Sequence, residues 1–381
     1  GDYAYESAPN STDLTWETVI TKNIGLDLGF LNNRLNVSFD AYIRDTKDML
    51  MAGKTLPGVY GASSPRMNVA DLRTKGWEAS VTWGDSFTLA SKPFNYRIMA
   101  GIGDNTSKVT KYDNPNRTLT DPYEGQQLGE IWGYVVDGYF KTDEEARNYK
   151  VDQSFVNQMI NASALDNGLH AGDLKFVDLD GNNKIEQTTS ANDRKDMKVI
   201  GNSLPRYNYN FGISADWYGI DFSVLFQGIG KQNWYPGAET SMFWGPYSRP
   251  YASFIPSDFM SQVWSEENTD AYFPRPRGYV ALGSNRELAV VNTKYLQNLA
   301  YCRLKNLSIG YTLPDKWLSK IGFEKIRVYF SGENLLTFTK LHSDYIDPEQ
   351  ASASNSWKTS KSDANIYPWA KTYSFGVDIT F

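Results

Sequence analysis

The chain has 381 residues, a net charge of −6 at pH 7 and a mean hydropathy of −0.50. No stretch approaches the roughly 20 apolar residues of a membrane helix, which excludes a helical membrane protein but not a transmembrane β-barrel, whose alternating pattern dilutes its apolar content. The acidic balance, without a basic cluster, argues against nucleic acid as a partner.

Residue types that carry chemistry are scarce. Cys302 is the only cysteine, so no intramolecular disulfide can form, and two histidines, His170 and His342, give little support to a zinc site or to histidine catalysis. Adjacent acids such as Glu144-Glu145 have nothing that orients them, and no phosphate loop or nucleophile elbow is present. The sequence therefore predicts that the protein is not an enzyme. It begins at Gly1 without a signal peptide, so we expect a mature product or a piece of a longer chain.

The first strong pattern is a hairpin with two long arms. Apolar and polar residues alternate over 16–30 and again over 35–44, and Asn32-Asn33 is suited to the tight turn between them. Leu26 and Leu28 fall on one face of the first arm, and Asp27 falls on the other. Each arm therefore has one apolar and one polar face.

The same alternation recurs along the chain, and the turns between strands alternate between short and long. Further strands are expected at 77–83, 94–102, 207–217, 220–226, 307–313, 326–330 and 372–381. Short turns are expected at 84–93, 218–219 and 314–324. Long loops are expected at 45–73, about 103–206, about 228–300 and about 334–370. The total is nine strands.

The last strand, Thr372 to Phe381, is compatible with two all-β architectures. Its length and its apolar face, which includes Phe375 and Val377, suit a strand that crosses a bilayer. The alternative is the edge strand of a soluble β-sandwich. A sandwich has no reason to keep short and long turns in strict alternation, whereas an outer-membrane barrel places short turns in the periplasm and long loops outside the cell. The pattern therefore favours a membrane barrel.

Several stretches resemble the SusC/RagA family of TonB-dependent outer-membrane transporters. They are TDLTWETVITKNIGLDLGFLNNRLNVSFDAYIRDTKDML (Thr12 to Leu50), GEIWGYVVDGYF (Gly129 to Phe140), AGDLKFVDLDGNNKIE (Ala171 to Glu186), VIGNSLPRYNYNFGISADWYGIDFSVLFQG (Val199 to Gly228) and the ending at Phe381. Together they span nearly the whole chain in the order found in the family.

The resemblance implies that residues 1–381 form the C-terminal part of a large antiparallel transmembrane β-barrel of the 22-strand transporter class, in the outer membrane of a Gram-negative bacterium. No plug domain and no N-terminal barrel strands are recognisable in the sequence. The implied partners are therefore the remaining N-terminal portion of the same transporter, TonB acting through the absent plug, a SusD-like surface lipoprotein and outer-membrane lipid.

One loop has the spacing of a calcium site. Asp178, Asp180 and Asn182 offer oxygen ligands at positions one, three and five, and Lys184 offers a backbone carbonyl, as at the start of an EF-hand loop. An insertion moves the expected closing carboxylate to Asp193. The alternative is an Asx-rich turn held by its own side chains. Calcium is therefore the only cofactor that the sequence suggests.

Aromatic residues, which make up 14% of the chain, crowd the long loops. Sugar rings stack on aromatic faces, so an importer of oligosaccharides would place some of these residues at its ligand. The candidates are Trp234, Tyr235, Trp244, Tyr247 and Trp357. The alternative is that these side chains pack the loops onto one another, or lie in the membrane interface.

Three functions are compatible with these patterns. The first, and the favoured one, is nutrient import by a SusC/SusD-like complex, most simply of oligosaccharides and otherwise of peptides. The second is a soluble all-β carbohydrate-binding module, and the third and weakest is an all-β glycoside hydrolase. The sequence does not identify the substrate.

Overall fold

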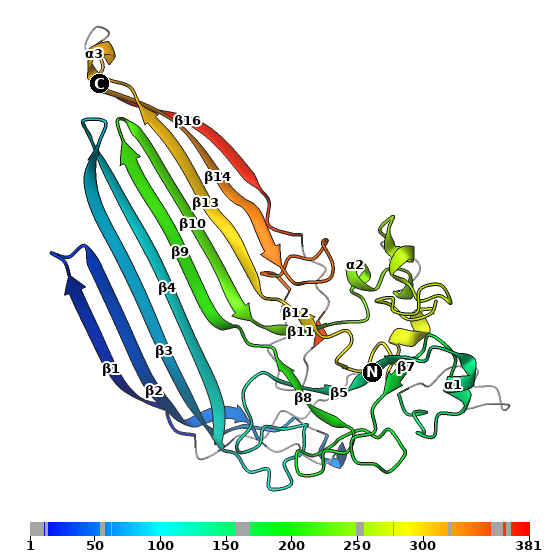
Figure 1. Ribbon diagram of the computed structural model, residues 1–381. Coiled ribbons are helices and arrows are strands. Elements are labelled where there is room, and N and C mark those ends of the chain that lie inside the picture. The colour runs from blue at the N-terminus through cyan, green and yellow to red at the C-terminus, as the bar shows by residue number, and fades with distance from the viewer. Residues whose placement is uncertain are drawn as a thin grey trace, which may run out of the picture.

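The computed structural model describes residues 11, 14–53, 58–61, 63–156, 168–248, 255–276, 278–318, 322–351, 361–362 and 367–381. Its main element is a nine-stranded antiparallel sheet in the order β1-β2-β3-β4-β9-β10-β13-β14-β16 (Figure 1). The strands of this sheet are β1 (Thr18–Phe30), β2 (Leu35–Ala52), β3 (Arg66–Leu89), β4 (Lys92–Lys111), β9 (Arg206–Trp217), β10 (Ile220–Lys231), β13 (Tyr301–Thr312), β14 (Lys325–Thr339) and β16 (Thr372–Thr380). All nine predicted strands are present, and each pairs with the strands that come before and after it among the nine.

The short connections lie at one end of the sheet, beside the C-terminus (Figure 1). Tyr218-Gly219 joins β9 to β10 with positive φ at both residues, which is the geometry of a two-residue hairpin turn. Ala90-Ser91 joins β3 to β4 in the same way. The connection from β13 to β14 carries the short helix α3 (Asp315–Leu318).

Three predicted connections were too long, because the strands continue beyond the apolar alternation. The expected turn at 84–93 is only two residues long, since β3 and β4 stay paired as far as Leu89 and Lys92. At the opposite end of the sheet, β2, β3 and β4 extend into the expected loops at 45–73 and 103–206. Polar pairs such as Arg73 Nε and Asp45 Oδ1, 2.6 Å apart, continue the pairing there. Backbone pairing does not require an apolar face.

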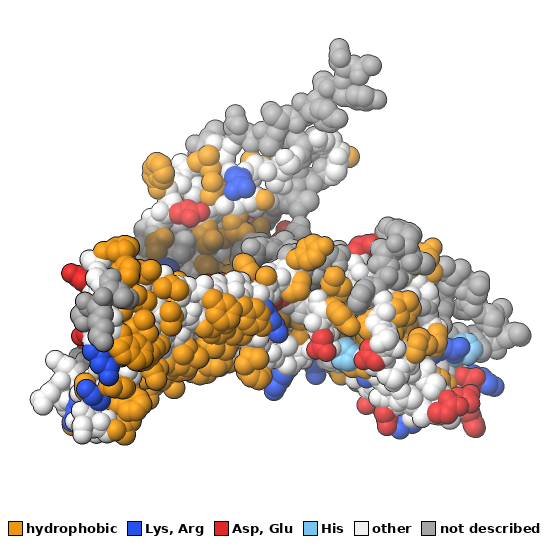
Figure 2. Space-filling view, turned by 90° about the horizontal axis from the view of Figure 1, so that it is seen from above, with side chains coloured by type: hydrophobic (Ala, Val, Ile, Leu, Met, Phe, Trp, Pro, Cys, Tyr) orange, Lys and Arg blue, Asp and Glu red, His pale blue; other side chains and the backbone are white. Residues whose placement is uncertain are grey.

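The register keeps one face of the sheet apolar across neighbouring strands. One row of directly opposed residues consists of Leu28, Val37, Val81, Ala100, Phe211, Phe226, Leu304 and Leu336. Many apolar side chains on this face are exposed, including Phe375 at 82% and Ile24 at 73% of their full accessible areas. Figure 2 shows hydrophobic side chains gathered over this face. A surface of this kind needs an apolar environment.

The long connections fold into one body at the other end of the sheet (Figure 1). Its small sheets have the strand orders β5-β8, β6-β7 and β12-β11-β15. Its elements are η1 (Gly58–Tyr60), β5 (Glu130–Tyr134), β6 (Val136–Tyr139), α1 (Asp143–Arg147), β7 (Leu174–Phe176), β8 (Met197–Asn202), β11 (Asn233–Pro236), α2 (Ser241–Trp244), η2 (Gly245–Tyr247), η3 (Phe259–Gln262), η4 (Tyr279–Leu282), β12 (Gln297–Asn298) and β15 (Lys361–Ser362).

The main hydrophobic core lies in this body of loops. It combines buried residues from three separate connections, such as Phe176, Phe273 and Leu341. Backbone hydrogen bonds also join the connections, as where Tyr134 N donates to Val291 O at 2.9 Å. Among the described residues, no helix is long and apolar enough to cross a membrane.

Candidate functional site

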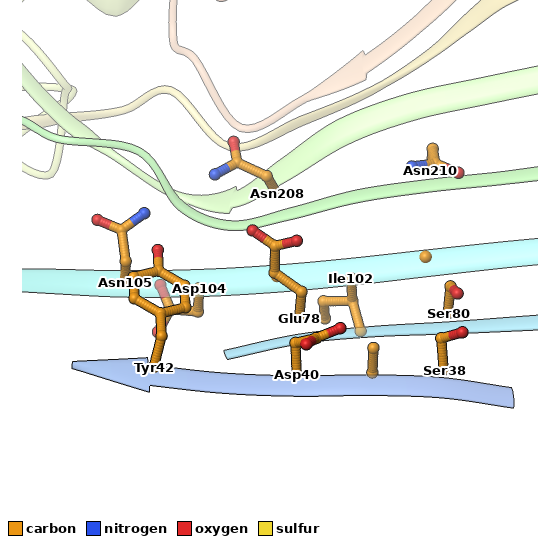
Figure 3. Close-up of a pocket in the computed structure, with 13 residues that line it drawn as sticks. Ser38, Asp40, Tyr42, Glu78, Ser80, Ile102, Asp104, Asn105, Asn208 and Asn210 are labelled. Atoms are coloured by element: carbon orange, nitrogen blue, oxygen red, sulfur yellow. The ribbon is translucent and has the colours of Figure 1, made fainter. Parts of the chain in front are cut away.

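The polar face of the large sheet carries a hollow of about 370 Å³ (Figure 3). Two adjacent rows of directly opposed residues line it. The first row consists of Asp40, Glu78, Gly103 and Asn208, and the second of Ser38, Ser80, Gly101 and Asn210, in each case from β2, β3, β4 and β9. Carboxylates, hydroxyls and amides therefore converge on one stretch of β4.

Two glycines on β4 form the floor of this hollow. A Cβ atom at Gly103 would lie 3.2 Å from Glu78 Cγ, and one at Gly101 would lie 3.3 Å from Asn210 Nδ2. The side chains of the flanking strands thus lean over β4 from both sides. Any larger residue at either glycine would displace the side chains of Glu78 or Asn210 and fill part of the hollow. Alternating glycines within a strand are the sequence signal of this site.

The candidate calcium loop brings three carboxylates together. Oxygen atoms of Asp178, Asp180 and Asp196 lie within 4.8 Å of one another, which suits convergence on one hard cation. Asp196 is completely buried, and its two oxygens accept from the backbone N–H groups of Leu179 (2.9 Å) and Glu186 (2.7 Å). Burial raises the pKa of Asp196. These residues could hold a calcium ion.

One of the predicted calcium ligands is replaced. Asp193 does not belong to the carboxylate group, because it turns back to form a β-bridge with Ser190, and Asp196 takes its place. Asn182 Oδ1 accepts from Lys184 N at 2.8 Å, and Asp178 accepts from Gly181 N at 2.7 Å, so the Asx-rich turn is also formed. The carboxylate group and the turn occur in the same loop.

The structure buries four of the five aromatic candidates. Trp234, Tyr235, Trp244 and Tyr247 are each 0 or 1% exposed and lie in the loop core, so no ring face is free to stack on a sugar. Their polar atoms are also occupied: Trp244 Nε1 donates to Gly237 O at 2.9 Å. The proposed stacking surface was therefore wrong for these four residues, because collective packing of the loops competes for them. Trp357 lies outside the described residues.

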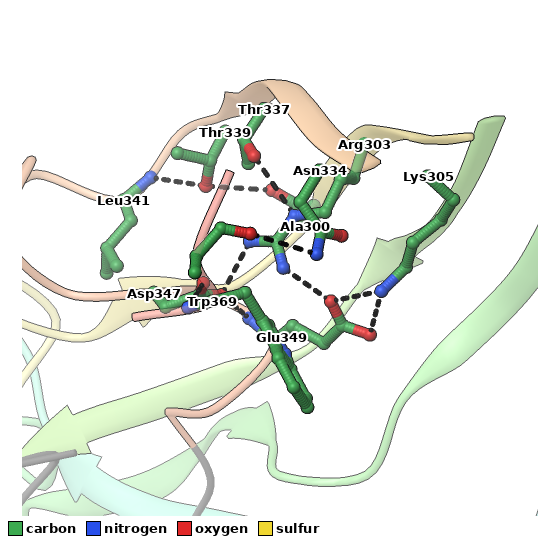
Figure 4. A network of polar contacts seen from close by, with 11 residues as sticks. Ala300, Arg303, Lys305, Asn334, Thr337, Thr339, Leu341, Asp347, Glu349 and Trp369 are labelled. Carbon is green, nitrogen blue, oxygen red and sulfur yellow. Dashed lines mark hydrogen bonds and ion pairs between the residues drawn. The ribbon is translucent and has the colours of Figure 1, made fainter. Parts of the chain in front are cut away.

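An ionic network that the sequence did not indicate anchors one loop to the sheet (Figure 4). Arg303 of β13 contacts Asp347 at 2.7 Å and Glu349 at 2.6 Å, and its side chain is only 3% exposed. Lys305 contacts the same Glu349 at 2.7 Å. Asp347 also accepts from Trp369 N at 3.1 Å. The acidic partners are more than 40 residues from the basic ones, so no local pattern could have predicted this network.

Comparison with known proteins identifies the family. A family model described as "TonB dependent receptor-like, beta-barrel" matches residues 1–335. The chain belongs to this TonB-dependent receptor family. TonB-dependent receptor P3 of Formosa agariphila is 28% identical over 97% of the chain. TonB-dependent receptor SusC of Bacteroides thetaiotaomicron is 24% identical, also over 97%. The RagAB peptide transporter has a similar fold, with a TM-score of 0.68 and 22% identity over 97% of the chain.

The TonB-dependent receptor chain spans about a third of the length of these proteins: 34% of P3, 32% of SusC and 36% of the RagAB chain. Its large sheet is the C-terminal portion of an outer-membrane β-barrel, and the sheet is not closed. Among the described strands, β1 pairs only with β2, and β16 pairs only with β14. The apolar face is accordingly the lipid face, and the face with the hollow is the lumen face.

Proposed function

We propose that the complete protein imports nutrients, most simply oligosaccharides, across the outer membrane with energy from TonB. The observation that carries this proposal is the two-faced sheet, which has an apolar outer face, a polar inner face, short turns at one end and a body of loops at the other. A soluble carbohydrate-binding module is not favoured, because it would expose side chains such as Phe375 and Ile24 to water.

The two free edges of the sheet support a partnership with the rest of the same transporter. Each edge strand presents N–H and C=O groups that hydrocarbon cannot satisfy, at a cost of several kcal/mol per group. We infer that β1 and β16 pair with strands of the remaining portion, which also supplies the plug on which TonB acts. The body of loops, at the extracellular end in this topology, would meet a SusD-like surface lipoprotein that covers the mouth.

The chemistry of the lumen wall supports a polar, hydroxyl-rich substrate. The hollow over β4 combines amide side chains such as Asn208 and Asn210 with hydroxyls such as Ser38 and Ser80. Peptides are the competing substrate class, and the test below separates the two.

Uptake by intact cells tests the function directly. Cells with the complete transporter and cells from which it is deleted would be given labelled neutral oligosaccharides or labelled peptides, each with and without an uncoupler. We expect oligosaccharide uptake that requires both the transporter and the proton gradient. Uptake of peptides alone would replace the proposed substrate, and uptake that is unchanged by the deletion would refute import by this protein.

A further inference from the structure

We propose that the outer wall of the barrel binds a phosphorylated glycolipid of the outer leaflet, at the edge of the apolar face on β1 to β4. This inference goes beyond nutrient import and rests on the proposed orientation, with the body of loops outside the cell. The plug lies in the lumen, and strands of the remaining portion would continue the sheet beside β1, so neither covers this outer surface. The surface, here called the basic patch, consists of Lys22, Lys47, Arg73, Lys75 and Lys108.

The register places the basic patch on the lipid face. Neighbouring residues along a strand point to opposite faces of a sheet. Gly76 lies under the lumen-facing ring of Tyr42, so Lys75, the residue before it, points outward. Lys22 and Lys75 lie in one row of directly opposed residues, on either side of Ile43. Strands are about 4.8 Å apart, so the two lysines start about 10 Å from each other and can reach the same phosphate group.

The basic patch has more positive charge than its acidic neighbours balance. Arg73 Nε lies 2.6 Å from Asp45 Oδ1. Lys47 Nζ lies 3.0 Å from Asp71 Oδ2. The exposed members that have no ion-pair partner among the described residues are Lys22, Lys75 and Lys108. Five basic residues against two aspartates leave a surplus of three positive charges, in a chain whose net charge is −6.

The basic patch begins where the apolar face ends. The outward residues of β3 that precede it are Trp83, Val81, Ala79 and Trp77. Tryptophan collects at the boundaries of a bilayer, and a lysine stem can lie along apolar surface while its ammonium group reaches the headgroups. Acyl chains on the apolar face would therefore bring headgroup phosphates to the basic patch. An acidic segment of a partner protein would match the charges but would give no account of the adjoining apolar face.

The test uses the complete transporter, purified in detergent and depleted of lipid, and native mass spectrometry to count bound lipid molecules. The probes are lipid A with its phosphate groups, the same lipid A after their removal, and phosphatidylglycerol. Lys22→Gln with Lys75→Gln removes two charges from one row of the basic patch. Lys92→Gln with Lys325→Gln is the matched control, because it removes two exposed lysines from the same sheet at the end with the short turns (Figure 1).

We expect the wild type to bind phosphorylated lipid A more tightly than the dephosphorylated form, with an affinity that falls as the salt concentration rises. The variant of the basic patch should bind phosphorylated lipid A about 30-fold more weakly, because each lysine at a charged lipid surface contributes about 1 kcal/mol. Its binding of dephosphorylated lipid A should equal that of the wild type. The matched control should bind both forms as the wild type does.

Four results would overturn the proposal. Equal binding of both forms of lipid A by the wild type would mean that phosphate is not recognised. Unchanged binding by the variant of the basic patch would place the lipid elsewhere, and an equal loss in the matched control would reduce the effect to overall charge. Preference for phosphatidylglycerol would assign the basic patch to the periplasmic leaflet. Import is judged separately, by uptake in intact cells, so failure of the lipid site and failure of the function are distinguishable.

Discussion

Replacing Arg303 by Met should release the loop segment 341–351 from the sheet. Arg303 and Asp347 are 3% and 4% exposed at the side chain, and their contact is 2.7 Å. Removing one partner of a buried ion pair costs about 3–5 kcal/mol, because the other charge stays buried. Asp347 keeps hydrogen bonds from the N–H groups of Glu349 (2.9 Å) and Trp369 (3.1 Å). We therefore expect the lower figure, about 3 kcal/mol.

Hydrogen exchange in the complete transporter measures this release. Each 1.4 kcal/mol corresponds to a factor of ten, so about 3 kcal/mol predicts roughly hundredfold faster exchange of the amides that open with this segment. Gln350 N and Ala351 N, which both donate to Asp347 O, are the amides to follow. Exchange in the barrel strands distant from the segment should not change.

Lys305→Met is the matched control, because Lys305 contacts the same Glu349 but is more exposed, at 19%. This change should cost no more than about 1 kcal/mol, or about fivefold in exchange rate. Arg303→Met combined with Asp347→Leu should recover much of the loss, since no buried charge remains unpaired. If Arg303→Met accelerated exchange no more than Lys305→Met, the buried pair would not be what holds the segment.

The ring of His342 stacks on Tyr272 with 3.5 Å between the ring centroids, and this partial desolvation lowers the pKa of His342 below 6.5. The unfolded chain therefore binds the proton first, and the stability of the loop body should fall as the pH falls from about 7 to about 5. Thermal unfolding of the wild type and of His342→Phe measures this effect, and an identical pH dependence in both would contradict it. If the carboxylate loop binds calcium, a high-resolution density map of the wild type should show an ion with oxygen ligands at about 2.3–2.6 Å. Asp178→Ala or Asp196→Asn should remove this ion. A wild-type map with only water there would favour the plain turn. Arg327 donates to Asp221 and Asp378, on two other strands, at 2.6 to 3.2 Å. Arg327→Met should therefore destabilise the pairing of the final strand by about 1 kcal/mol, which thermal unfolding in detergent measures. Arg34→Met, at a more exposed ion pair, is the control and should have a smaller effect.

The sequence by itself determined the sheet. Alternation with period two is a local property, so the nine strands of the large sheet and the face on which each of their side chains lies could be predicted from neighbouring residues alone. The short strands within the long connections, such as β5 and β8, were not predicted. Turn residues such as Asn32-Asn33 and Tyr218-Gly219 fixed where the chain reverses, because they adopt positive φ. Strand ends were less predictable, since backbone pairing continues where the apolar pattern stops, as between Gly84 and Leu89.

The tertiary structure decided which residues meet. Trp244 and Tyr247 are aromatic residues in loops whether they bind a ligand or fill a core, and only the packing of three distant connections buries them. Asp196 and not Asp193 joins the carboxylate group, because a β-bridge pairs Asp193 with Ser190, and that bridge is not encoded in the ligand spacing. Arg303 and Asp347 meet across 44 residues, and the hollow over β4 requires four strands in one register. These sites depend on contacts between residues distant in the sequence, which local pattern and propensity do not specify.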